Sequence, residues 1–216
     1  MPLNINGTTG NSGVDGSVSA PAVTGTDSNT GITFPSADTI KFATGGVERM
    51  AITNSGITGI TAGITMSDQW RITSSFSYGN SVTTINANWE RADSDNPGFI
   101  GSAMTESSGV FTFPETGIYR IAFKASHTNT SGAASNNAYI YTTVNNSSYS
   151  DASISLTRNP SANAYAFTYN EFVFDVEDTS THKVKFGVYA SGANSLVYGH
   201  SERMGTAVYF MRLGDT

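Results

Sequence analysis

The sequence predicts an all-β fold that contains an antiparallel β-sandwich, and three observations lead to this prediction. β-Branched and aromatic residues, which favour strands, occur in short runs separated by turn residues. Only 13% of the 216 residues are charged, against about 25% in ordinary globular domains, and Ser, Thr, Asn and Gly fill the difference. Finally, residues 117–125 alternate in polarity with the period of two that is typical of a half-buried strand.

A corner around Pro114 and Gly117 links the two best-defined strands of the chain. Residues 110–113 favour a strand, and Pro114 ends it because proline has no backbone N–H to donate to a neighbouring strand. Gly117 permits the sharp turn into the next strand. In that strand one face carries Tyr119, Ile121, Phe123 and Ala125, and the other carries Arg120 and Lys124.

This corner resembles a motif of the complement globular-head and tumour-necrosis-factor-like (TNF-like) jelly rolls. The matching residues are Gly109, Phe111, Thr112, Pro114, Gly117 and Tyr119. The resemblance implies that residues 67–216 form a ten-strand antiparallel jelly roll that assembles as a homotrimer. It also implies that residues 205–213 form the closing strand, which lies centrally in the inner sheet of that family.

Residues 67–216 have the apolar density of a real core. Its first members are Trp70, Ile72, Phe76, Tyr78, Val82, Ile85 and Trp89. Further strands are predicted over residues 138–144, 167–176, 184–189 and 206–213. Polar, turn-rich stretches separate them, over residues 129–137, 145–151, 158–163 and 191–195. In a jelly roll such loops gather at the two ends of the sandwich.

The first thirty residues contain no aromatic side chain, no Lys and no Arg. Ordering each residue costs about 1–2 kcal/mol, which the few apolar groups present do not recover. Two interpretations remain open for residues 1–30: a flexible linker, or an extended low-complexity anchor that becomes ordered only on a partner protein.

Residues 31–66 are predicted to form a slender β-rich shaft. Strands over 39–43 and 47–52 flank Gly45 and Gly46, a hairpin signal, and the unit Gly-Ile-Thr recurs at residues 31, 56, 59 and 63. Such a segment buries little in a single chain, so we expect copies from several chains to wrap around one axis. The run from Thr39 to Ile52, followed by these repeats, resembles the shaft or attachment segments of bacteriophage fibre proteins, particularly those of marine and cyanobacterial phages.

Charge and composition exclude several classes of function. The net charge of −6, without any Lys or Arg cluster, argues against nucleic acid and anionic membranes as partners. The chain has no cysteine, so no disulfide or thiolate chemistry is available. The start of the sequence has no secretion signal and no later stretch reaches membrane-spanning length, so we expect a soluble protein without membrane insertion.

Chemistry-bearing residues are sparse, and we predict no catalytic, cofactor-binding or metal-binding residues and no enzymatic activity. His127, His182 and His200 lie far apart in sequence without metal-ligand spacing. The run from His200 to Glu202 is explained by a polar loop without catalysis. Residues 93–98 have the carboxylate density of a calcium loop, but Met104 stands where an EF-hand needs Glu. A solvated turn is the preferred interpretation there, and calcium is the alternative.

Tyrosines lie in or beside the loop-flanked strands, at Tyr139, Tyr141, Tyr149, Tyr165 and Tyr169. Tyr together with Asn and Ser makes an adaptable surface for sugars or proteins. For Tyr139 and Tyr141 we favour the alternative, a contact with a neighbouring subunit.

Two functions follow from these observations. The first is a non-enzymatic virion structural protein, a trimeric fibre anchored by its N-terminus to another virion protein, either on the capsid as a decoration or on the tail as a short fibre. The second is a receptor-binding module that recognises a host surface glycan or protein through the head loops, with affinity raised by trivalency. A tail fibre would combine both.

Overall fold

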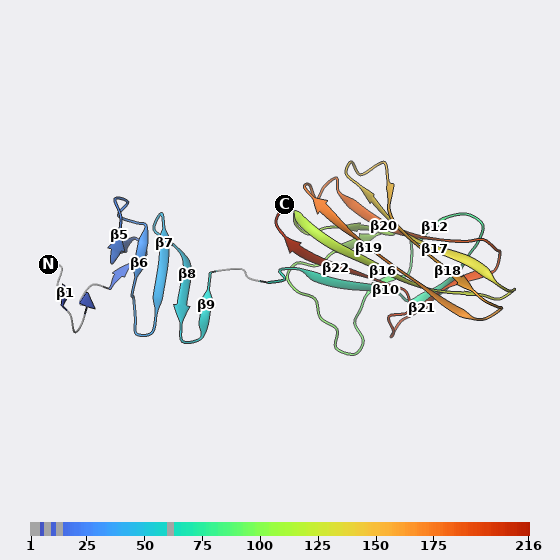
Figure 1. The fold of residues 1–216 in the computed structure, drawn as a ribbon, viewed down its shortest axis with the longest axis horizontal. Coiled ribbons are helices and arrows are strands. Elements are labelled where there is room, and N and C mark those ends of the chain that lie inside the picture. Colours follow the sequence, from blue (N-terminus) through green and yellow to red (C-terminus); the bar gives the residue numbers. More distant parts are fainter. Residues whose placement is uncertain (1–4, 7–9, 12–14, 60–62) are drawn as a thin grey trace. The chain divides into compact units, whose positions relative to one another are not determined.

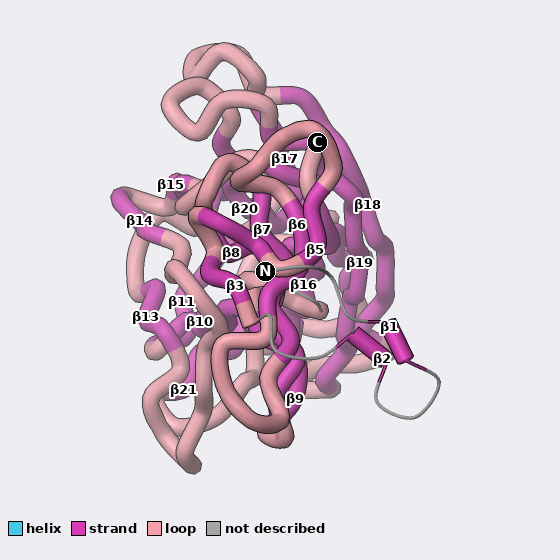
Figure 2. Tube along the Cα trace, turned by 90° about the vertical axis from the view of Figure 1, so that its left-hand side faces the viewer, coloured by secondary structure: helices cyan, strands magenta, loops and turns pink. Residues whose placement is uncertain are grey.

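The computed structural model describes residues 5–6, 10–11, 15–59 and 63–216, and the chain forms two compact units, residues 1–63 and 64–216. Every regular element in the described part is a strand (Figures 1 and 2), so the prediction of an all-β fold is confirmed. No helix long and apolar enough to cross a membrane occurs among these residues.

The N-terminal unit contains a five-stranded antiparallel sheet in the order β5-β6-β7-β8-β9. Its strands are β5 (Val23–Thr24), β6 (Gly31–Thr33), β7 (Ile40–Thr44), β8 (Val47–Thr53) and β9 (Gly56–Thr58). Two short hairpins precede it, β1 (Ile5–Asn6) with β2 (Gly10–Asn11) and β3 (Gly16–Ser17) with β4 (Ala20–Pro21). The β7–β8 hairpin confirms the prediction made from Gly45 and Gly46, which both have positive φ. Two Gly-Ile-Thr units form β6 and β9, and the unit at residues 59–61 lies partly outside the described residues.

Two sheets form the head, residues 64–216. The first sheet holds β10 (Ser67–Ile72), β11 (Ser74–Tyr78), β13 (Trp89–Arg91), β16 (Gly117–Asn129), β19 (Tyr165–Val176), β21 (Ser195–His200) and β22 (Ala207–Gly214). The second holds β12 (Thr83–Thr84), β14 (Thr105–Ser107), β15 (Val110–Thr112), β17 (Ala134–Thr143), β18 (Ser150–Asn159) and β20 (Lys183–Ala190).

Because some short strands share a position, each sheet is five strands wide, and the two sheets together match the ten-strand jelly roll that the resemblance implies. In the first sheet β21 and β22 share one edge of β16, while β19 occupies the other. In the second sheet β12 and β15 share one edge of β20, and β17 occupies the other. The closing strand β22 lies between β16 and β10, so its predicted central place is confirmed.

The corner around Gly117 carries the chain from one sheet to the other. β15 pairs with β14 and β20 in the second sheet, whereas β16 belongs to the first, so the two strands flanking the corner do not pair with each other. Gly117 has a φ of +141°, and a Cβ atom there would lie 2.5 Å from Nε of Arg212. Glycine is therefore required by both the backbone conformation and the space.

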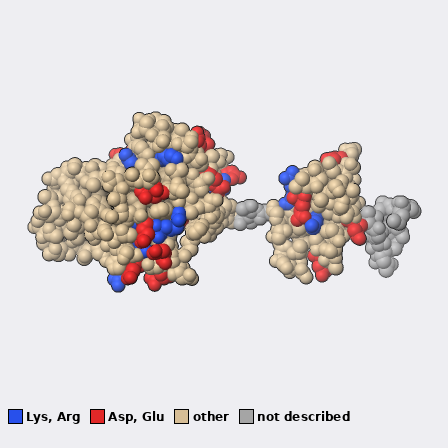
Figure 3. Space-filling view, turned by 180° about the vertical axis from the view of Figure 1, so that it is seen from behind, with Lys and Arg blue, Asp and Glu red and all other residues tan. Residues whose placement is uncertain are grey.

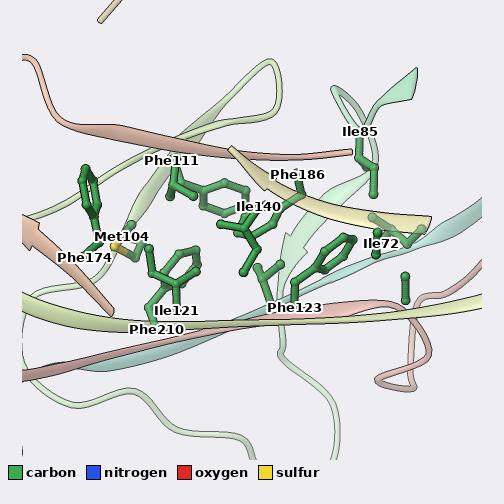
Figure 4. Close-up of a cluster of buried hydrophobic side chains, with 14 of the residues drawn as sticks. Ile72, Ile85, Met104, Phe111, Ile121, Phe123, Ile140, Phe174, Phe186 and Phe210 are labelled. Atoms are coloured by element: carbon green, nitrogen blue, oxygen red, sulfur yellow. The ribbon is translucent and has the colours of Figure 1, made fainter. Parts of the chain in front are cut away.

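Aromatic side chains from both sheets meet in the core between them (Figure 4). The ring of Phe111 lies 5.6 Å from that of Phe186 and 5.2 Å from that of Phe210, measured between centroids. Ile72 and Ile85 are buried as predicted, whereas Val82 is 49% exposed, so its assignment to the core was wrong. Val82 lies outside the regular strands and directly precedes the short strand β12.

Two stretches differ from the predicted strands and turns. Strand β18 was not predicted, because Ile154 and Leu156 are exposed while Ser residues alternate with them, the reverse of the usual pattern. The turn predicted over 129–137 is shorter in the structure, because β16 extends to Asn129 and β17 begins at Ala134. Asn129 and Asn136 therefore lie in these two strands, where they are buried. Both asparagines satisfy their side-chain amides by hydrogen bonds, as described below, which makes burial tolerable.

Candidate functional site

The outward side of β19 exposes a row of large apolar side chains. Alternate residues of a strand point to opposite sides, and here the inward residues Ala166, Thr168 and Asn170 are buried. The outward residues Tyr165, Phe167, Tyr169 and Val173 are each more than half exposed. Together with Tyr209 of β22 we call this surface the aromatic face.

A charge pair lies in the middle of the aromatic face. Nε of Arg120 donates a hydrogen bond of 2.9 Å to Oε2 of Glu171, and the hydroxyl of Tyr169 donates one of 3.2 Å to the same oxygen. The bond from Arg120 lowers the pKa of the Glu171 carboxyl, and the bond to Glu171 raises the pKa of Arg120. The two charges therefore compensate each other within one chain.

A hollow of about 540 Å³ opens beside this pair. Arg120, Lys124, Tyr169 and Tyr209 line it. Nζ of Lys124 donates a 2.9 Å hydrogen bond to the carbonyl oxygen of Met204, and burial raises the pKa of Tyr209. The walls offer aromatic surface and cationic donors, but no arrangement of nucleophile and base among the lining residues.

The three histidines have separate surroundings. His127 is buried between the sheets, where Nδ1 lies 2.6 Å from the hydroxyl of Tyr78 and Nε2 lies 2.8 Å from that of Thr168. His182 packs against Phe174, with ring centroids 5.6 Å apart. Nδ1 of His200 accepts a hydrogen bond from the backbone N–H of Glu202, which fits the predicted polar loop. Among the described residues no three His, Asp or Glu side chains form a group that could hold a metal ion.

The acidic loop at residues 93–98 is held by a buried arginine. The guanidinium of Arg71, whose side chain is 1% exposed, pairs with the carboxylates of Asp93 and Glu90. A second pair, Asp68 with Arg91 at 3.0 Å, anchors the neighbouring strands. Arg71 thus supplies a positive charge at Asp93, and the preference for a solvated turn over calcium stays a prediction.

The predicted tyrosines fall on two different sheets. Tyr139 and Tyr141 lie on the outer side of β17 in the second sheet, where their rings stack 5.5 Å apart. Nζ of Lys185 lies 4.0 Å from the ring centroid of the neighbouring Tyr149. Tyr165 and Tyr169, by contrast, belong to the aromatic face. The predicted subunit contact of Tyr139 and Tyr141 stays a prediction, and the larger exposed aromatic surface lies elsewhere.

Four loops meet at one end of the sandwich, over residues 79–82, 130–133, 160–164 and 191–194, and none contains Lys, Arg, Asp or Glu. Backbone hydrogen bonds hold these loops: Thr130 N–H donates to the oxygen of Asn194, and Ala190 N–H, at the end of β20, donates to that of Gly79. Figure 3 shows one end of the head without blue or red atoms on the side that it presents. We call this the charge-free end.

Buried amides and a histidine support the charge-free end from within. The side chain of Asn129 accepts hydrogen bonds from the N–H groups of Ser131 and Gly132 and donates to the carbonyl oxygen of Ala193. The side chain of Asn159 donates to the carbonyl oxygens of His127 and Ala164. Asn136 accepts a 2.8 Å hydrogen bond from the hydroxyl of Tyr78. The loops are therefore held by a connected polar network, which restricts their conformations.

Comparison with known proteins identifies the fold of the head and does not identify its function. No protein-family model and no curated protein sequence matches the chain. A crystal structure of murine APRIL matches with a TM-score of 0.50 and 14% identity, over 68% of this chain and 98% of APRIL. The Eiger TNF of S. frugiperda matches with a TM-score of 0.51 and 9% identity, over 71% of this chain and 96% of Eiger. The PRD1 vertex protein P5 matches at 15% identity, over 71% of this chain and 100% of P5, with a TM-score of only 0.43. The head is thus a jelly-roll sandwich similar to the TNF-family folds.

Proposed function

We propose that the protein is a non-enzymatic structural protein of a bacteriophage virion, a homotrimeric fibre with a projecting jelly-roll head. The aromatic face is the observation that carries this proposal. Large apolar side chains that are exposed together on one surface often mark a region that another protein covers. Copies of the same chain can cover it without new charge repulsion, because Arg120 and Glu171 compensate each other within each chain.

The virion assignment rests on the N-terminal half of the sequence. The run from Thr39 to Ile52 and the Gly-Ile-Thr units resemble phage fibre segments, and the surface is polar but weakly charged. In this proposal residues 1–30 anchor the protein to a capsid protein or to a tail adaptor, residues 31–66 form the shaft, and residues 67–216 form the head. The mechanism is assembly by burial of apolar surface, without turnover of a substrate.

Mass in solution tests the assembly step. Light scattering should give a trimer for the full-length chain and for a head fragment that starts at Ser67. A trimer only at full length would shift assembly to the shaft, and monomers from both proteins would overturn the fibre. An antibody against the head should then label purified particles at the capsid or at the tail in electron micrographs, which decides the site of attachment.

A second function, recognition of a host surface glycan or protein, is favoured by the charge-free end. Asn, Ser and Gly side chains on preorganised loops suit a neutral ligand, and three heads would add their affinities. A glycan array probed with the full-length protein tests this function, with uncharged glycans expected to bind. Asn163→Asp adds a charge at a left-handed position of this end, and Asn146→Asp does the same in the loop after β17 as a matched control. Only the first variant should lose binding.

A further inference from the structure

The five-stranded sheet of the N-terminal unit has one apolar face. The strand register places Ile32 opposite Phe42, Phe42 opposite Met50, and Ile52 opposite both Ile40 and Ile57. Directly paired residues point to the same side of a sheet, as do residues two apart in a strand. All six side chains therefore share one face. Val23, paired with Ile32, extends this face to the edge strand β5.

Nothing within the described part of the N-terminal unit covers this face. Ile57 is 61% exposed, Val23 51% and Ile52 37%. The buried residues of this unit, within residues 15–59, are Thr33, Ala43 and Ala51, and the register places them on the opposite side. A sheet gains its stability by burying its apolar side against a second layer. The second layer must therefore come from outside these residues.

The apolar face has both a hollow and a protruding side chain, so it can supply both sides of a protein contact. An open hollow of about 530 Å³ lies on it, lined in part by Phe34, Ile40 and Ile52. Ile57, which is paired with Ile52, protrudes from the same face. A surface that holds both a protrusion and a hollow can form a head-to-tail contact with copies of itself, and such contacts close into a ring when the rotation between neighbouring copies allows it.

Charge distribution favours copies of the chain over a foreign protein. The six paired residues of the apolar face are uncharged, and Asp38 is the one charged residue among the described residues that line the hollow. Lys41 and Glu48 project from the opposite side, where they form a 2.7 Å ion pair with each other. Apart from Asp38, like faces can thus meet without bringing like charges together, and the face offers no charge pattern that would select a different partner.

We propose that the apolar face of β5–β9 is a self-association surface, covered in the assembled protein by the same face of further copies of the chain. The expected number of copies, three, rests on the proposed homotrimer. This contact is separate from the aromatic face of the head. The shaft thereby acquires a core that a single chain lacks.

Two neighbouring residues of β9 provide the test, because the chain has no cysteine of its own. Ile57 lies on the apolar face and Thr58 on the opposite one, and both are exposed in the single chain. Single variants Ile57→Cys and Thr58→Cys in the full-length protein are treated with a maleimide. The thiol of Ile57→Cys should react about tenfold or more slowly than that of Thr58→Cys, because reactivity follows exposure.

Light scattering on the same samples separates the possible outcomes. The proposal is supported if Ile57→Cys reacts slowly in the assembled protein and this protection disappears when dilution produces monomers. Protection that persists in monomers assigns the cover to another part of the same chain and overturns it. Equal reactivity of both variants in a trimer also overturns it, since the face would then be open, while leaving the trimer of the proposed function intact. Monomers at every concentration would instead contradict the proposed homotrimer, and this inference would fail with it.

Discussion

The hydroxyl of Tyr119 donates a hydrogen bond of 2.9 Å to the carbonyl oxygen of Glu115, four residues earlier in the chain. It closes the corner at which the chain passes from the second sheet to the first. Nε of Arg212, from the closing strand, donates a bond of 2.9 Å to the next carbonyl oxygen, that of Thr116. Burial raises the pKa of Tyr119 to about 12, so the hydroxyl remains a donor throughout the physiological range. The corner is therefore fixed by side chains of two adjacent strands.

Removal of this hydroxyl should weaken the head. Tyr119→Phe leaves the carbonyl of Glu115 without its partner while keeping the ring, which packs 4.7 Å from that of Phe113. We expect a loss of about 1–2 kcal/mol in the free energy of unfolding, measured by chemical denaturation. Tyr189→Phe, at a half-buried tyrosine on the outer side of β20, is the control. Equal effects of the two substitutions would contradict the role of the corner bond.

The closing strand is expected to be indispensable. β22 pairs with β16 on one side and β10 on the other, and its residues Val208 and Phe210 are buried in the core. A chain that ends at Arg203 loses both pairings and these side chains, so we expect it to show no cooperative thermal transition. A chain that ends at Gly214 retains β22 and should melt cooperatively. A cooperative melt of the shorter chain would show that the strand is dispensable.

A lysine on the aromatic face should prevent assembly without unfolding the head. Val173 is 56% exposed and points away from the core, so Val173→Lys costs little in a single chain, within about 0.5 kcal/mol. In an assembled face the same lysine would have to be buried, which costs the desolvation of its charge. Light scattering of the head fragment should therefore show monomers for this variant. Val144→Lys, at a 61% exposed valine in the loop after β17, is the control and should leave the mass unchanged.

Sequence patterns predicted the central strands of the head because their polarity agrees with their burial. In β16 the residues Tyr119, Ile121 and Phe123 are large, apolar and completely buried, while Arg120 is exposed. The corner could be recognised for the same reason, since proline and glycine each have a local effect that needs no distant partner. The prediction therefore succeeded where local and tertiary preferences agree.

Sequence patterns pointed to Tyr165 and Tyr169 as surface residues, but the rest of the aromatic face could not be identified because its pattern is inverted. In β19 the large residues Tyr165 and Phe167 point outward, and the small or polar Ala166 and Thr168 point inward. A period of two shows that a strand has two sides, but the side that faces the core depends on what lies across each of them. The pairing of Arg71 with Asp93 is similarly hidden in the sequence, because it joins residues from a strand and a distant loop.

His127 should make the stability of the head depend on pH. Tyr78 uses its hydrogen to donate to Asn136, so the Nδ1 atom of His127 must carry the proton in the bond to Tyr78. Nε2 is then the acceptor for the hydroxyl of Thr168, and the ring is neutral. Burial lowers the pKa of His127 from 6.5 to about 4. The polar network at the charge-free end thus contains a group that resists protonation as long as the head is folded.

The direction of the pH effect follows from this lowered pKa. As the pH falls below 6.5 the unfolded chain binds a proton at His127 while the folded head does not, so protonation favours unfolding. The contribution of His127 is complete above pH 6.5 and is lost progressively as the pH falls toward 4, by about 3 kcal/mol in all. Chemical denaturation at several pH values between 7 and 4 measures this slope. His127→Gln should remove most of it, whereas His200→Gln, at a half-buried histidine in β21, should retain it. Of the three histidines, only His127 has both ring nitrogens hydrogen-bonded inside the network that holds the loops. Equal slopes of stability against pH for the two variants would therefore mean that a group other than His127 causes the pH dependence.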